Sequence, residues 1–141
     1  MLVNASFVWY SELMKRGILL LMLILSGCVY RNPLDRADFR FQTIMVPPHV
    51  LSSWYRISEV GRPLTVYVEG LETPPGELVR KQAVNDKSAN IAYIGRPCQY
   101  FQTKICEKEM TPAESDKIVL KGIEQLKKKA GTSSVDVKGL K

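Results

Sequence analysis

The chain has 141 residues, of which 45% are hydrophobic and 24% are charged. These proportions are ordinary for a globular protein, and they exclude a wholly disordered or collagen-like chain. A chain of this length holds one hydrophobic core, so we expect a single domain. One histidine and three cysteines are too few for a His/Cys metal cluster, and we expect neither a metal nor a cofactor.

Most of the net charge of +6 belongs to the carboxyl-terminal region. Residues 29–116 hold 11 basic and 11 acidic side chains, whereas residues 117–141 hold seven lysines and two acidic residues. Such a surplus attracts nucleic acid or anionic lipid. However, these lysines lie opposite the apolar positions of an expected helix, and no aromatic platform accompanies them. We therefore interpret them as a solvated helix face and expect no nucleic-acid partner.

An apolar run, residues 17–25, follows Lys15 and Arg16 near the amino terminus. A run of this length is too short to span a membrane but suits the centre of a secretory signal. The next residues, Leu25-Ser26-Gly27-Cys28, resemble the lipobox of bacterial lipoproteins. This resemblance implies cleavage before Cys28 and a diacylglycerol on its thiol, so the lipid anchor is the expected membrane partner.

Residues 1–27 are therefore expected to form a signal segment, with Met14 as the alternative start. The expected location is the cell envelope, on the periplasmic or outer side of a membrane. Because Val29 and not Asp follows the cysteine, the resemblance to sorted lipoproteins favours the outer membrane. The alternative is a single uncleaved membrane segment over residues 14–29.

Residues 28–38 are polar and unpatterned, so we expect an anchor and tether there and a domain over residues 39–141. Phe39 and Phe41 alternate with polar residues, which predicts a short strand that ends at Pro47-Pro48. A second strand is expected near residues 54–57. The two strands predict an antiparallel pair.

Two later segments, Leu64–Val68 and Asn90–Ile94, are almost wholly apolar, as in strands buried on both faces. Residues 77–86 between them and residues 111–131 after them have helical patterns, and a third strand begins near Ser134. This order predicts an α/β fold with a partial parallel sheet (strand-helix-strand-helix-strand) and an amino-terminal antiparallel strand pair.

The second helix has strong end signals. Thr111 and Glu114 fit a capping box, and Pro112 fits the first helical position. Gly122 allows close packing, and Gly131 fits a left-handed carboxyl cap.

The segments Arg62–Gly70 and Asn90–Tyr100 resemble a family of bacterial lipoproteins with the α/β-hydrolase fold, which shows a Val-Tyr-Ile-Glu-Gly-type strand and an Arg-Pro-Cys-Gln-Tyr-type segment. The resemblance implies the amino-terminal half of that fold. It also implies that the third strand should lead into the Gly-x-Ser-x-Gly turn of the nucleophile. Here Gly139-Leu140-Lys141 takes that place, and Gly-x-Ser-x-Gly occurs nowhere in the sequence.

We therefore assign no catalytic residue. His49, the sole histidine, precedes every candidate serine, and we interpret it as a loop residue. Neither Glu69 nor Asp136 has a histidine to orient. The leading hypothesis is an exported, membrane-anchored and catalytically inactive remnant of an α/β hydrolase. The alternatives are a small envelope lipoprotein that acts as a binding or structural module, and half of a split hydrolase completed by a separate chain.

Two cysteines, Cys98 and Cys106, remain once Cys28 is assigned to lipid. Export favours a disulfide between them, since the compartments beyond the inner membrane are oxidising. We also expect the strands at residues 91–94 and 135–137 to be poorly covered at sheet edges, so that a protein partner could complete the sheet.

Overall fold

The computed structural model describes residues 12–18, 32–72 and 76–140. The chain divides into two units, Met1–Arg31 and Asn32–Lys141. In the first unit, residues 12–18 are helical with exposed side chains. Cys28 and most of the apolar run lie outside the described residues. Within the described ranges, no helix is both long and apolar enough to cross a bilayer.

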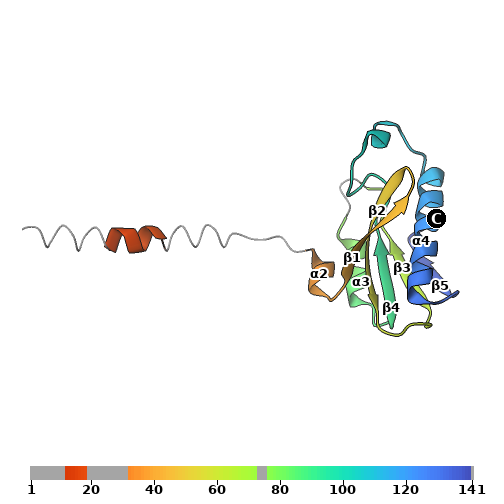
Figure 1. Ribbon diagram of the computed structural model, residues 1–141, viewed down its shortest axis with the longest axis horizontal. Helices are drawn as coiled ribbons and strands as arrows, with labels where there is room; N and C mark the ends of the chain where they lie inside the picture. The colour runs from red at the N-terminus through yellow and green to blue at the C-terminus, as the bar shows by residue number, and fades with distance from the viewer. Residues whose placement is uncertain (1–11, 19–31, 73–75, 141) are drawn as a thin grey trace, which may run out of the picture. The chain divides into compact units, whose positions relative to one another are not determined.

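The second unit is built on a five-stranded mixed sheet in the order β1-β2-β4-β3-β5 (Figure 1). The strands are β1 (Arg40–Val46), β2 (His49–Ile57), β3 (Leu64–Val68), β4 (Asn90–Ile94) and β5 (Val135–Lys138). β2 is antiparallel to both β1 and β4, whereas β3 is parallel to both β4 and β5. The expected α/β class is confirmed, with the antiparallel pair at one end of the sheet.

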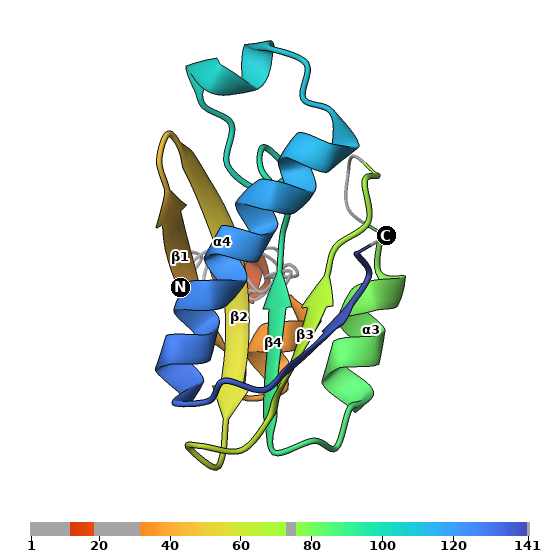
Figure 2. The same cartoon turned by 90° about the vertical axis from the view of Figure 1, so that its right-hand side faces the viewer.

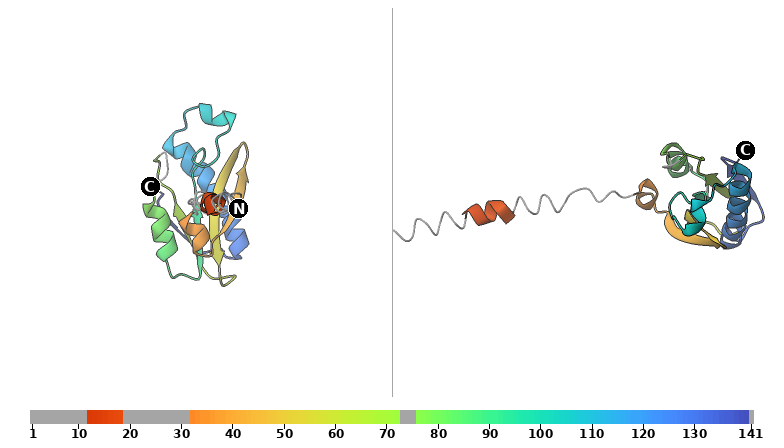
Figure 3. Two further views of the ribbon diagram at one scale, coloured as in Figure 1. Left: turned by 90° about the vertical axis from the view of Figure 1, so that its left-hand side faces the viewer. Right: turned by 90° about the horizontal axis from the view of Figure 1, so that it is seen from above.

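Helices cover both faces of this sheet. They are α2 (Pro33–Arg36), α3 (Leu78–Asn85) and α4 (Pro112–Ala130), with a short 3₁₀ helix, η1 (Lys104–Glu107). α4 runs across one face (Figure 2), and α2 and α3 lie on the other (Figure 3). The two crossovers, through α3 and through α4, therefore pass on opposite sides of the sheet.

Two apolar clusters fill the space between the sheet and its helices. On the α4 side, Val66 and Val68 of β3 pack with Val119 and Ile123 of α4. On the other side, Tyr67 of β3 packs in a cluster that includes residues of α2 and α3. Successive β3 residues thus enter different clusters, which is why this strand needs an apolar residue at nearly every position.

The ends of α4 follow the predicted capping pattern. The Glu114 N–H donates to Thr111 Oγ1 at 3.2 Å, and the Thr111 N–H donates to Glu114 Oε2 at 3.0 Å. Gly131 ends the helix with a φ of 65°, a left-handed conformation that costs glycine little. Gly122 is buried where the helix crosses the sheet.

Two expectations are wrong. The fold begins at Asn32 and not at residue 39, because the Asn32 side chain caps α2 and Leu34 is fully buried. The strand Asn90–Ile94 is not a poorly covered edge, since it lies between β2 and β3 and Ile91 and Ile94 are fully buried. Among the described strands, the edges of the sheet are β1 and β5.

Replacing Gly122 by a large residue should destabilise the fold. A Cβ at Gly122 would lie 3.0 Å from Ile94 Cδ1 and from Leu51 Cδ1. Gly122→Leu should therefore lower the free energy of unfolding by about 1–3 kcal/mol through overpacking, despite the gain in helix propensity. Chemical denaturation measures this change. Lys121→Leu, at an exposed position of the same helix, is the control, and an equal effect of the two substitutions would contradict close packing at Gly122.

Candidate functional site

Buried polar side chains meet at the carboxyl ends of β3 and β4. Glu69 directly follows β3, and Arg96 comes two residues after β4. Because parallel strands end at the same edge of a sheet, these residues are brought close together. Open α/β sheets place their ligand and catalytic groups at this edge, so it is the candidate site by position.

Glu69 is the buried carboxyl group of this site, with 2% of its surface exposed. The Tyr93 hydroxyl donates to Glu69 Oε2, and the Gly70 N–H donates to Glu69 Oε1 at 3.0 Å. The hydroxyls of Tyr93 and Tyr100 lie 2.8 Å apart. Burial raises the pKa of the Glu69 carboxyl above its ordinary value of 4.5, and the Gly70 hydrogen bond and the charge of Arg80 oppose this shift only in part.

Arg96 joins three segments of the chain. Its Nε donates to the Glu69 carbonyl oxygen at 2.6 Å. Its Nη1 donates to Ser115 Oγ at 3.1 Å and to Asp116 Oδ1 at 2.6 Å. Arg96 is 6% exposed, so its pairing with the Asp116 carboxylate offsets the cost of burying a charge. The guanidinium therefore ties the end of β3 to the first turns of α4.

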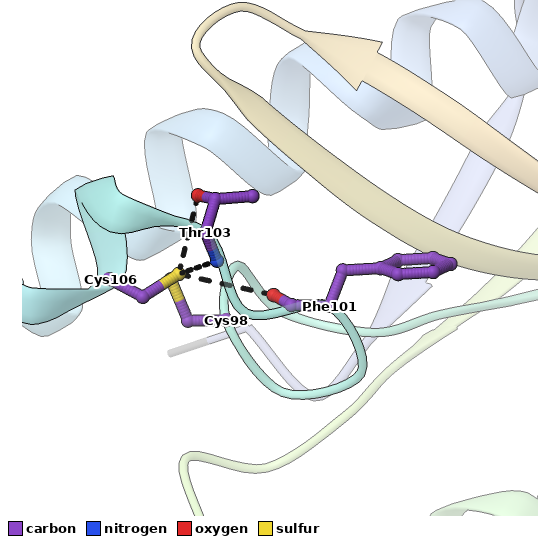
Figure 4. Close-up of a disulfide and its surroundings, with 4 residues drawn as sticks. All are labelled: Cys98, Phe101, Thr103 and Cys106. Carbon is purple, nitrogen blue, oxygen red and sulfur yellow. Dashed lines mark hydrogen bonds between the residues drawn. A yellow bond between two sulfur atoms is a disulfide. The ribbon is translucent and has the colours of Figure 1, made fainter.

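The loop that follows β4 is closed by a disulfide between Cys98 and Cys106 (Figure 4). The predicted pairing is confirmed, with sulfur atoms 2.05 Å apart. Within this loop the Gln99 amide donates to the carbonyl oxygens of Gly70 at 2.6 Å and Glu72 at 3.1 Å. A closed loop of this length stabilises a chain by about 2.5 kcal/mol in the chain-entropy model. The disulfide thus restrains the segment that holds the loop after β3.

Aromatic packing covers the same network. The Tyr100 ring lies 5.2 Å from that of Trp54, and Trp54 lies 5.6 Å from Tyr93. A Cβ at Gly95 would come within 2.6 Å of the Tyr100 ring, so only glycine leaves room for this packing. Ring packing therefore holds the Tyr93 hydroxyl against Glu69 and the Tyr100 hydroxyl against that of Tyr93.

The other candidate residues lie apart from this network. His49 begins β2 and lines an open groove of about 420 Å³ with Met110 and Ile118. Within the described part of the chain, no serine, threonine or cysteine lines that groove. Asp136 is exposed on β5, where it pairs in register with Thr65. The structure brings neither residue into a nucleophile–base pair.

A second polar pair borders edge strand β5. The Tyr67 hydroxyl donates to Asp86 Oδ2 at 2.6 Å, and burial together with this bond raises the pKa of Tyr67 to about 12. Lys138 Nζ lies 5.2 Å from the centre of the Tyr67 ring. These residues line an open groove of about 560 Å³ between α3 and β5.

The network has no arrangement for covalent catalysis among the described residues. The Glu69 carboxyl accepts from the Tyr93 hydroxyl, and Arg96 Nε and Nη1 donate to protein oxygens. No group of three or more His, Cys, Asp or Glu side chains in the described ranges is placed to hold a metal ion. What the arrangement does is lock two loops and a helix together at the edge of the sheet.

No protein-family model, curated protein or solved structure matches this chain.

The buried position of Glu69 predicts a pH-dependent stability. Because the folded pKa is raised, the contribution of Glu69 to stability is fully present below the pKa of the unfolded chain and is lost as pH rises through the folded pKa. The free energy of unfolding of the wild type, relative to Glu69→Gln, should therefore fall across that window and then level off. Denaturant unfolding at a series of pH values measures it.

Glu109→Gln, at an exposed carboxylate in the loop before α4, is the matched control. A difference between wild type and Glu69→Gln that stayed constant at every pH would contradict the raised pKa.

Proposed function

We propose that this chain is an exported, lipid-anchored protein whose residues form the amino-terminal part of an α/β-hydrolase-like sheet and have no hydrolase chemistry of their own. The observation that supports it most is the topology. An antiparallel pair is followed by β3-α3-β4-α4-β5, with the crossover helices on opposite faces.

The positions of the resembling segments support the same proposal. Arg62–Gly70 contains β3 and the loop that supplies an oxyanion-hole amide in α/β hydrolases. Here the Gly70 N–H already donates to Glu69 Oε1, and the Gly70 carbonyl accepts from Gln99. An amide engaged in this way is not offered to a substrate oxyanion, which favours a structural role for the loop.

The sequence supports the lack of catalysis. Residues 1–141 contain no Gly-x-Ser-x-Gly, and position 141 is a lysine where the resemblance would place the nucleophile. His49 begins β2 at the same edge of the sheet as the carboxyl ends of β3 and β4, but within the described part of the chain no serine, threonine or cysteine lines the groove that it borders. Acyl transfer through a serine needs a nucleophile, a base within hydrogen-bond reach and an oxyanion site.

Export is supported by two features of different kinds. The lipobox-like Leu25-Ser26-Gly27-Cys28 indicates acylation in the envelope, and the Cys98–Cys106 disulfide is typical of an oxidising compartment. The pairing also leaves Cys28 as the one cysteine outside the disulfide. Its thiol is therefore available for lipid.

A second candidate function is a binding module, or half of a split enzyme, whose partner adds a strand. It is favoured by β5, which pairs with β3 alone among the described strands and borders the groove beside Tyr67. A stable complex with a second chain that protects the β5 amides from hydrogen exchange would favour this candidate.

Acylation of Cys28 is the first test. Metabolic labelling with a palmitate analogue should mark the wild type and leave Cys28→Ser unlabelled, because the thiol is the acceptor. Cys98→Ser with Cys106→Ser, which removes the other two thiols, should retain the label. Label that persists in Cys28→Ser would refute the lipid anchor.

The second test concerns catalysis. The purified chain should not react with a fluorophosphonate probe and should not hydrolyse activated esters faster than His49→Ala, since among the described residues no serine lines the groove at His49. Intact-protein mass spectrometry and ester turnover measure the two outcomes. Stoichiometric labelling of one serine, with turnover lost on its substitution by alanine, would overturn the inactive assignment.

A further inference from the structure

The fold begins very close to the proposed lipid attachment point. Asn32 belongs to the compact unit, since its side chain accepts from the Leu34 N–H at 3.1 Å and its carbonyl accepts from the Asp35 N–H at 3.0 Å. Only residues 29–31 separate it from Cys28. Four extended residues span at most about 14 Å, whatever conformation they adopt.

This length is short compared with the size of the unit. A compact unit of about 110 residues has a radius of gyration of about 13 Å, equivalent to a sphere of about 17 Å radius. If Asn32 lies within about 14 Å of the bilayer, the side of the sphere opposite Asn32 cannot touch it. A residue must lie in the same half of the unit as Asn32 to contact the membrane.

The half that carries Asn32 and α2 is the face of the sheet opposite α4 (Figure 3). Side chains alternate along β1, so Ile44 and Val46 point into the α4 cluster. Phe41 and Met45 are exposed by 50% and 54% on the α2 face. The Phe41 ring lies 5.0 Å from that of Trp54, a member of the α2-side cluster.

The chemistry of this face suits the headgroup region of a bilayer. An exposed aromatic ring and a flexible apolar side chain on the same face of β1, together with the exposed Arg36, can take part in both apolar and phosphate contacts. The lysines of α4, including Lys117 and Lys121, belong to the opposite face. The short tether therefore keeps the most basic helix away from the lipid surface.

We infer that the α2 surface, defined by Arg36, Phe41, Thr43 and Met45, lies against the bilayer surface in which acylated Cys28 is anchored. The helix α4 then faces away from this surface. This inference rests on the proposed lipid anchor. The exposed face of β1 thus contacts the lipid headgroup layer. The short tether brings the two together, so the contact does not require anionic lipid.

Trp54 is a natural reporter of this arrangement. The chain has two tryptophans, and Trp9→Phe leaves Trp54 alone whether or not the signal is removed. The acylated protein would be reconstituted in phosphatidylcholine vesicles with and without a headgroup spin-labelled phosphatidylcholine, which quenches tryptophan at short range. Trp54 emission should be lost with the spin label. Inserting about 20 Gly-Ser residues between Arg31 and Asn32, which adds roughly 25 Å of reach, should restore it.

A matched pair of reporters tests the orientation. Phe41 and Leu120 are similarly exposed, at 50% and 47%, but lie on the α2 surface and on α4. In a Trp9→Phe, Trp54→Phe background, Phe41→Trp should be quenched and Leu120→Trp should not. Equal quenching of the two would overturn the inference.

The outcomes separate the inference from the proposed function. If mass spectrometry shows an acylated Cys28 but Trp54 is unquenched, the orientation is wrong and the anchor stands. If no acyl chain is found, the anchor is wrong, and the orientation is refuted with it. Quenching that survives the Gly-Ser insertion unchanged would also overturn the tether-based argument.

Discussion

The two-sided burial of β3 and β4 is the constraint on which the rest of the structure depends. Both strands lie inside the sheet, and their side chains enter one apolar cluster under α4 and another under α2 and α3. A strand that is buried on both faces requires helices on both sides of the sheet, and the two crossovers supply them. The same requirement draws Leu34 of α2 into the core and so sets where the fold begins.

Parallel strands also gather their carboxyl ends, and here that edge is closed by polar side chains. Arg96 links the Glu69 carbonyl to Asp116 of α4, while Gln99 holds the loop at Gly70. The buried carboxyl of Glu69 accepts from the Tyr93 hydroxyl, which in turn lies beside the Tyr100 hydroxyl. Each of these groups would be costly to bury alone, so the network stabilises the fold only as a complete set. An edge that holds catalytic loops in other α/β sheets is fixed here by internal contacts.

The proposed function and the membrane orientation follow from the same geometry. The proposed role is one of binding or positioning, and it is supported by the groove at His49, which within the described part of the chain is lined by no serine, threonine or cysteine. A domain tied to a bilayer by a few residues presents one face to the lipid and leaves the other accessible. In the proposed orientation, the accessible side contains α4 with its exposed lysines, and β5 forms one edge of the sheet. A protein partner would therefore meet these elements first.

Local patterns in the sequence were sufficient for β3, β4 and the capped helix α4, because alternation, apolar runs and the Thr111–Glu114 box act over a few residues. The Cys98–Cys106 pairing was also predictable, since few cysteines were left to pair. The hydrogen-bond network around Glu69 was not predictable, although Glu69 and Arg96 lie in the two segments that carry the family resemblance. Apart from Gly70, the hydrogen-bond partners of their side chains are between 19 and 27 positions away in the sequence, and only the meeting of β3, β4 and α4 brings them together. The helix Pro33–Arg36 was not predicted for the same reason, since Leu34, its one buried residue, joins the core only when the chain folds against the sheet.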